Sequence, residues 1–319
     1  MQTANTLAPI FLIVVVGFLL RQTGFIAGPL VSGLNRLTFW VGLPCLLFLR
    51  VAEADLAGTA VSGLLGLLLA ATLVTVAGGL GFARVLGLAR PARGALAQGA
   101  FRGNLAYVGL PVIAYWLADS GLPAAEAVRL ETLAVVCLGT LVVLYNVLAV
   151  WVLMPAAPAG RSRFDNCCRR VFGVLRNPLI LACLAGALWR ATDWGLPVAP
   201  RRGLAALGQM ALPLSLLAIG ASLDFRMMRG RFGPVLTGAL IKVMLGPLVA
   251  VALAGWFGVT GPERVVGLLL LACPTAVASY VMAEQMGADA TIAGGIVLLS
   301  TLLSMGSLAW VLACGAATL

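Results

Sequence analysis

The chain has 319 residues and contains no histidine, and only 10% of its residues are charged. The lack of histidine excludes Ser-His-Asp triads, histidine-ligated metals and histidine proton switches. Apolar residues make up 61% of the chain and the mean hydropathy is +1.06, whereas soluble domains are about half apolar and a quarter charged. This composition excludes a disordered chain and a water-soluble globule, and it indicates a multi-pass membrane protein in a lipid bilayer.

The net charge of +10 comes from 21 basic and 11 acidic residues, and Lys242 is the only lysine. On a soluble chain such a balance would suggest nucleic acid. Here the arginines are scattered between apolar stretches, as juxtamembrane arginines that fix topology are, so we expect no nucleic-acid partner. The seven cysteines form no C-x-x-C pair and lie mostly in apolar segments. We therefore expect no disulfide framework, no metal site and no cofactor.

The apolar stretches predict ten membrane spans, since each approaches the ~20 residues that a helix needs to cross a bilayer. The first stretch lacks a basic n-region and a cleavage site, so we interpret it as a span and not as a signal peptide. The sequence therefore predicts an all-α fold. The spans are expected at residues 5–21, 31–50, 58–83, 93–118, 130–154, 177–192, 203–223, 232–257, 264–285 and 291–314.

Residues 155–176 are the only connection with loop character, and they divide the chain into two halves, 1–154 and 177–319. At a constant offset of 169, about 11 of 47 positions are identical between the halves, more than such a biased composition should give by chance. The rarest matches are Pro9 with Pro178, Arg21 with Arg190, Pro44 with Pro213 and Asp55 with Asp224. Five spans per half would insert the second half upside down, so we predict two inverted five-helix repeats.

The distribution of basic residues predicts the orientation of the chain in the membrane. Alternate connections beginning after the first span carry about 13 basic residues and the other set about six. By the positive-inside rule the richer set, which includes residues 155–176, is cytoplasmic. We therefore expect a protein of the cytoplasmic membrane with both termini outside.

The fourth predicted span is a poor membrane helix, because it places Arg102, Asn104, Gly109 and Pro111 at mid-membrane depth. Pro111 lacks an N–H and disturbs the helix one turn earlier, near Tyr107. Unsatisfied backbone is tolerated in a membrane only where protein or a water-filled cavity covers it. The combination of a kink, a charge and an amide favours a binding site.

The ninth predicted span is the counterpart in the second half, where Pro274 interrupts the helix. Thr275 and Ser279 are four residues apart and share one helical face, although each hydroxyl alone is also typical of back-bonding to a carbonyl one turn earlier. Interrupted helices at matching positions of two inverted halves predict a transport site. The N-terminal ends of half-helices attract anions, so we expect an anionic substrate at this place.

Five further assignments rest on depth and charge. Arg102 is either a clamp for a substrate carboxylate or an internal ion-pair partner. Lys242, in the middle of a span where a charge is costly, is either functional or structurally paired. Asn146 is better interpreted as an interhelical hydrogen bond than as a ligand. Glu284 and Asp289 are candidate gate or coupling groups, or solvated loop charges. The coupling ion stays open between Na⁺, bound by carbonyl and hydroxyl oxygens, and H⁺, carried by Glu284 or Asp289.

Several motifs resemble the bacterial auxin efflux carrier (PIN-like) transporters, which are related in fold to the bile-acid and sodium symporters. The resemblance rests on GFI at residues 24–26, LNRLTFWVGLP at 34–44, GNLAYVGLP at 103–111, CPTAVASY at 273–280 and LSTLLS at 299–304. It implies a dimeric elevator in which spans one, two, six and seven form the scaffold and the other six spans move. It further implies that the interrupted fourth and ninth spans cross, with an organic anion bound beside the crossing.

Together these patterns predict a secondary active transporter for a small organic anion such as a carboxylate. They also predict that the protein is a homodimer formed through its scaffold helices. The substrate would contact Arg102, Asn104 and the backbone near Gly109, Pro111 and Pro274. Thr275 and Ser279 would support its binding. One alternative is a sodium-coupled symporter of the bile-acid type. Another is a membrane enzyme or a non-transporting subunit, but the chain has no H-E-x-x-H and no G-x-S-x-G motif, so we expect no enzyme activity.

Overall fold

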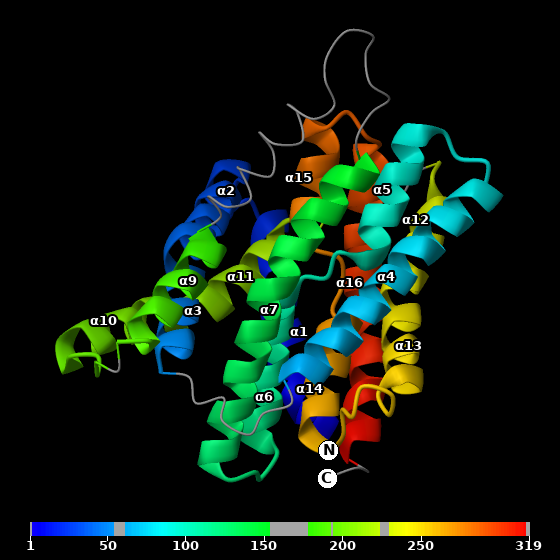
Figure 1. Ribbon diagram of the computed structural model, residues 1–319. Coiled ribbons are helices and arrows are strands. Elements are labelled where there is room, and N and C mark those ends of the chain that lie inside the picture. The colour runs from blue at the N-terminus through cyan, green and yellow to red at the C-terminus, as the bar shows by residue number, and fades with distance from the viewer. Residues whose placement is uncertain (1, 54–60, 154–177, 193, 224–229, 317–319) are drawn as a thin grey trace, which may run out of the picture. The chain divides into compact units, whose positions relative to one another are not determined.

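The computed structural model describes residues 2–53, 61–153, 178–192, 194–223 and 230–316 (Figure 1). Within these ranges the chain is helical between its turns, and the only β-type pairing is one isolated bridge. The predicted all-α fold is confirmed. Predictions for residues 155–176, with Cys167 and Cys168, and for Asp55 and Asp224 lie outside the described residues.

Six helical stretches are long and apolar enough to cross a membrane, which confirms a multi-pass membrane protein. Three shorter apolar helices accompany them, at Leu7–Gln22, Leu105–Asp119 and Leu181–Arg190. The count of ten spans and their inverted arrangement stay predictions. The six stretches are Gly28–Ala52, Val61–Val85, Ala124–Leu153, Val198–Ala221, Phe232–Leu253 and Ala290–Cys314.

The chain divides into two compact units, which are described separately. Unit 1 comprises Met1–Val61, Ala106–Thr140 and Arg176–Leu223, and unit 2 comprises Ser62–Leu105, Leu141–Leu175 and Asp224–Leu319. The long helix α7 (Ala124–Leu153) runs from one unit into the other. Three of the boundaries, at 61/62, 105/106 and 140/141, fall inside the predicted third, fourth and fifth spans and not between spans.

Unit 1 is built around two helix pairs, α1 with α11 and α3 with α9. Two glycines explain the close approach of the first pair: a Cβ at Gly17 would overlap the carbonyl of Leu217, and one at Gly220 would overlap the carbonyl of Val14. The backbones of α1 and α11 thus touch directly, as small residues permit in membrane helices. The helices of unit 1 are α1 (Gln2–Gln22), α2 (Gly28–Leu37), α3 (Leu43–Ala52), α6 (Leu110–Asp119), α9 (Pro178–Arg190), α10 (Val198–Gln209) and α11 (Ala211–Ala221).

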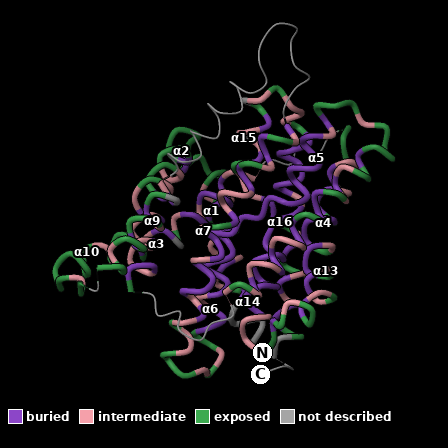
Figure 2. The backbone as a smooth tube through the Cα atoms, viewed as in Figure 1, coloured by how far each residue is buried: buried purple, intermediate pink, exposed green. Residues whose placement is uncertain are grey.

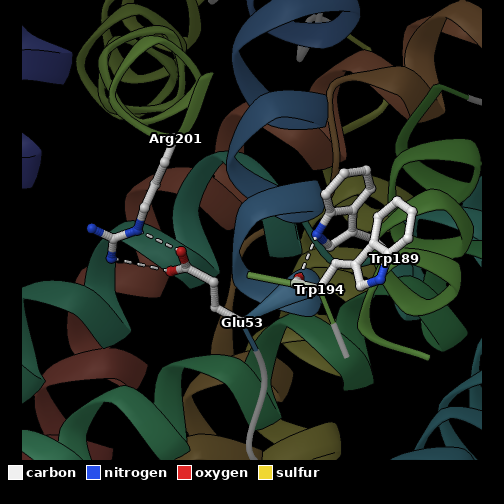
Figure 3. A network of polar contacts seen from close by, with 4 residues as sticks. All are labelled: Glu53, Trp189, Trp194 and Arg201. Atoms are coloured by element: carbon white, nitrogen blue, oxygen red, sulfur yellow. Dashed lines mark hydrogen bonds and ion pairs between the residues drawn. The ribbon is translucent and has the colours of Figure 1, made fainter. Parts of the chain in front are cut away.

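A surface network ties the ends of three of these segments together (Figure 3). The guanidinium of Arg201, on α10, forms a forked ion pair with Glu53, which follows α3. Nearby, the indole N–H of Trp189 donates to the carbonyl of Trp194 at 3.0 Å, and the two rings meet edge to face. Arg201 and Glu53 are both exposed, so the ion pair contributes little to stability, about 0–1 kcal/mol.

Unit 2 is organised around α16 (Ala290–Ala316), which packs against α5, α12, α14 and α15. Its apolar cluster joins Ile292, Ala293 and Ile296 to Leu96 and Val235, and buried positions run along α16 in Figure 2. The other helices of unit 2 are α4 (Val61–Val85), α5 (Arg90–Phe101), α12 (Phe232–Leu240), α13 (Gly246–Leu253), α14 (Gly261–Ala272) and α15 (Ala278–Gln285).

Three π-helical turns in the described ranges each end two residues before a proline. They are η1 (Thr38–Gly42) before Pro44, η2 (Leu105–Gly109) before Pro111 and η4 (Ile241–Leu245) before Pro247. Proline lacks an N–H and its ring collides with the carbonyl four residues earlier, and a widened turn accommodates both effects. In the fourth predicted span Pro111 is thus absorbed by η2, and helical structure is lost earlier, at residues 102–104.

Candidate functional site

In unit 2, the segments that follow α5 and α14 pair with each other. Gly103 and Thr275 form an antiparallel bridge. The N–H of Asn104 donates to the carbonyl of Pro274 at 2.7 Å, and the N–H of Ala276 donates to that of Arg102 at 2.9 Å. We call residues 102–104 and 273–276 the paired segments. Each supplies the backbone partners that the other loses by leaving the helix, as non-helical backbone inside a membrane protein requires.

Gly103 lies close to the side chains of Leu105 and Lys242. An ideal Cβ at position 103 would lie 3.1 Å from Cδ2 of Leu105, 3.3 Å from Cε of Lys242 and 3.5 Å from its Nζ, so a larger residue would press against both side chains. Pro274, on the partner segment, has no N–H to donate, and its carbonyl is the acceptor for Asn104. The sequence at each break therefore suits the extended pairing.

Arg102 carries a buried charge with neutral partners. Its side chain is 9% exposed, one amino group donates to Oδ1 of Asn146 at 2.8 Å, and the other contacts the sulfur of Met282. Asn146 in turn donates to the carbonyl of Val142 at 2.9 Å. Neither an amide nor a thioether neutralises a guanidinium, and no carboxylate in the described part of the chain pairs with Arg102. The internal ion pair considered from the sequence is not formed there.

Lys242 is the second buried cation beside the paired segments. It lies in η4 and is 2% exposed, and its Nζ donates to the carbonyl of Leu271 at 2.6 Å. Leu271 belongs to the last turn of α14, where the helix dipole is negative. As for Arg102, the residues described by the structure offer Lys242 no acidic partner. The paired segments are therefore flanked by two positive charges that no carboxylate of the described unit offsets.

Thr275 holds the paired segments against two helices. Its N–H donates to Oγ of Ser300 on α16 at 2.9 Å, and its hydroxyl donates to the carbonyl of Gly99 on α5 at 2.7 Å. Thr275 is fully buried and its hydroxyl is already used in this bond. Its role in this geometry is to connect the paired segments to α5 and α16. Ser279, in the first turn of α15, is also fully buried, and its hydroxyl has no hydrogen-bond partner among the described residues.

Replacing Thr275 by valine is expected to lower the free energy of unfolding by about 1–3 kcal/mol, because the Gly99 carbonyl loses its buried donor while side-chain volume is kept. Thr275→Ser keeps the hydroxyl and should lose less. Thermal unfolding of the purified protein checks this, with Thr237→Val as the control, since the half-buried Thr237 donates to Gly233 within its own helix. A Thr275→Val variant that unfolds like the wild type would contradict this role.

The remaining predicted site residues fall into two groups. Asn104 is buried in the paired segments, and Asn146 reaches Arg102 from α7. Gly109 and Pro111 are buried in η2 and α6, which belong to unit 1, whereas the paired segments belong to unit 2.

Glu284 and Asp289 are not brought to the paired segments. Glu284 is exposed near the end of α15. Asp289 caps α16 by accepting the N–H of Ile292 at 3.1 Å, and it lies 3.7 Å from Arg231. Its own N–H donates to Pro91, eleven residues before Arg102 and hence about 16 Å away along α5.

Sequence reasoning did not assign a role to Met282 or Gln98. Gln98 precedes Arg102 by four residues on one face of α5, is fully buried and contacts the same sulfur at 3.8 Å, while its amide oxygen has no hydrogen-bond partner. The four-residue spacing was a usable signal, whereas nothing in the sequence placed Met282 opposite it. Across the described ranges, no three cysteine, aspartate or glutamate side chains gather to hold a metal ion.

Comparison with known proteins matches this chain to transporters over nearly its full length. A family model described as "Membrane transport protein" matches residues 3–158 and 170–312. A protein of Methanothermobacter thermautotrophicus (strain Delta H), described as an "Uncharacterized transporter", is 26% identical over 320 residues that cover 97% of each chain. These matches point to a transporter and not to an enzyme. The resemblance to the auxin efflux carrier (PIN-like) proteins is confirmed, and the chain belongs to the membrane transport protein family.

Proposed function

We propose that this transporter is a secondary active carrier of a small organic anion, such as a carboxylate. The observation that carries the proposal is the pair of buried cations, Arg102 and Lys242, beside the paired segments, with only neutral partners in the described part of the chain. An uncompensated charge is costly in a membrane interior. A bound anion would offset both charges at once.

The arrangement also offers donors suited to a carboxylate. The guanidinium of Arg102 can present two N–H groups to a carboxylate, and the ammonium of Lys242 has three donors, of which one is bound to Leu271. The N-terminus of α15 follows the paired segments directly, and its dipole favours negative charge. In this proposal Asn104 and Ser279 add polar contacts, and Thr275 acts by holding the segments in place.

We further propose the membrane arrangement that the family resemblance implies. Residues 1–154 and 177–319 form two inverted repeats joined by a cytoplasmic segment at 155–176, with both termini outside the cytoplasmic membrane. The fourth and ninth spans are interrupted at the paired segments, and spans three to five and eight to ten move against a dimeric scaffold of spans one, two, six and seven. The repeat identities at offset 169 and the family support this arrangement.

The proposal is tested by flux of labelled mono- and dicarboxylates into proteoliposomes, with and without ion gradients. Asn104→Ala and Pro274→Ala are each expected to abolish uptake at unchanged membrane levels. Alanine at 104 keeps the backbone bond to Pro274, so that variant isolates the side chain, whereas alanine at 274 supplies an N–H and lets α14 continue. Asn35→Ala, in α2, is the control.

Full uptake by both variants would contradict this site, and failure of the wild type to move any small carboxylate would contradict the anion substrate. Uptake of a bulky amphipathic substrate that strictly requires Na⁺ would favour a bile-acid-type symporter instead.

A further inference from the structure

The last turn of α14 is capped by side chains from three directions. The final carbonyls of a helix have no partner within the helix and are normally bonded by solvent, side chains or ligands. Here the donors are side chains of the protein itself. Cys273 contacts the carbonyl of Leu269 at 3.1 Å, Lys242 that of Leu271 at 2.6 Å and Ser307 that of Ala272 at 3.2 Å.

The carbonyls of the paired segments are also occupied. Those of Arg102 and Pro274 accept backbone N–H groups from the opposite segment, and that of Gly99 accepts the hydroxyl of Thr275. Six carbonyl groups around the two breaks thus each have a donor from within unit 2. One of those donors, Lys242, carries a full positive charge.

We propose that Lys242 is a tethered cation that occupies the position of an inorganic coupling cation at the C-terminus of α14, so that neither Na⁺ nor K⁺ is bound there during transport. In transporters with discontinuous helices, coupling cations are coordinated by unwound carbonyls and by half-helix C-terminal ends. The ammonium of Lys242 satisfies the same kind of oxygen at 2.6 Å. The statement that transport is not coupled to Na⁺ or K⁺ rests on the proposed function. The statement that Lys242 fills a cation position at the end of α14 concerns binding alone.

Electrostatics reinforces the exclusion of a second cation. Nζ of Lys242 would lie 3.5 Å from a Cβ at Gly103, so its charge sits against the paired segments. The neighbouring Arg102 is buried without a carboxylate partner among the described residues. A cation entering this region would therefore meet two fixed like charges in a poorly solvated environment.

The test compares melting temperatures of the purified wild type and Lys242→Met in chloride salts of N-methylglucamine, Na⁺, K⁺ and methylammonium at equal ionic strength. We expect the wild type to melt within about 1 °C in all four salts, because no site is empty. Lys242→Met should melt several degrees lower in N-methylglucamine and regain at least half of that loss in one of the small cations. Lys242→Arg keeps the charge and should show no cation response.

Met244→Leu is the matched control, because Met244 lies in the same turn but is 51% exposed; its melting should not change. Wild-type protein stabilised by several degrees specifically by Na⁺ or K⁺ would overturn the proposal. So would a Lys242→Met variant that melts as the wild type does, or that no small cation stabilises. If Lys242→Met does not fold, the salt dependence of the wild type and of Lys242→Arg decides.

Flux measurements address the coupling part. Anion uptake by the wild type should be equal, within about twofold, when Na⁺ is replaced by N-methylglucamine, and a tenfold dependence on Na⁺ would overturn it. If no small anion is transported at all, the proposed function fails, but the melting experiment still tests whether Lys242 occupies a cation site.

Discussion

Replacing Arg102 with glutamine is expected to reduce the initial rate of organic-anion uptake by about 30-fold or more. Arg102 is 9% exposed, and among the described residues its guanidinium reaches Asn146 and Met282, so in the proposed function its charge pairs with the bound anion. Losing one partner of a buried, hydrogen-bonded charge pair costs about 2–5 kcal/mol, and each 1.4 kcal/mol corresponds to a factor of ten. Uptake of a labelled carboxylate into proteoliposomes containing equal amounts of protein measures the effect.

Two variants separate the charge of Arg102 from its geometry. Arg102→Lys keeps the charge but loses the planar fork that binds a carboxylate through two donors, so an intermediate rate is expected. Arg93→Gln is the control on the same helix, because in the described part of the chain Arg93 donates to the nearby carbonyl of Leu88 at 2.9 Å, and its rate should stay near wild type. Normal uptake by Arg102→Gln would remove this arginine from the site.

Replacing Gly220 with valine should prevent unit 1 from folding normally. The backbone of α11 at Gly220 lies directly against the carbonyl of Val14 on α1, and Gly17 faces Leu217 in the same way. A branched side chain at position 220 can be accommodated only if the two helices separate along their contact. We expect a loss of more than about 3 kcal/mol, above the usual range for an overpacked core. Thermal unfolding in detergent and the monodispersity of the purified protein report it.

Gly81→Ala provides the comparison, since Gly81 is exposed on α4 and a Cβ there meets no atom within 4 Å. Alanine has the higher helix propensity by about 1 kcal/mol, so this variant should be as stable as the wild type or slightly more so. Equal melting of Gly220→Val and Gly81→Ala would show that α1 and α11 do not touch in the folded protein.

The existence of the helices could be predicted because a long apolar run has few alternatives in a membrane. The span predicted at 291–314 coincides with α16 (Ala290–Ala316), and that predicted at 58–83 with α4 (Val61–Val85). The position of the break in the fourth span was harder to predict from the sequence. Pro111 pointed to Tyr107, but a proline disturbs one turn and η2 absorbs it. The loss of helix at 102–104 depends on pairing with residues about 170 positions later, which no local pattern reveals.

The sequence indicated which residue types belong to the candidate site, but few of the contacts between them. Arg102, Asn104 and Lys242 stood out because polar groups are expensive in an apolar span. Asn146 was expected to form an interhelical hydrogen bond, but its pairing with Arg102 was not predicted. Met282 and Leu271 were not expected as partners, because they lie 180 residues from Arg102 and 29 residues from Lys242. Such contacts follow from which helix faces meet. The hydroxyl of Thr275 fitted a ligand contact by sequence equally well, and only its bond to Gly99 identifies it as a tie.

The widened turns before Pro44, Pro111 and Pro247 have a consequence for how the apolar pattern is phased along these helices. A π-helical turn contains about one residue more than an α-helical turn, and one residue corresponds to about 100° of rotation about the axis. The spacing of buried residues in α13 is therefore shifted by one residue from the spacing in α12, and the same holds for α3 relative to α2. Deleting a single residue from η1 or η4 would therefore restore a regular helix while leaving the side chains beyond it on their present faces. Converting either turn to regular α-helix without a deletion would instead rotate everything beyond it by about 100° and exchange lipid-facing for buried side chains.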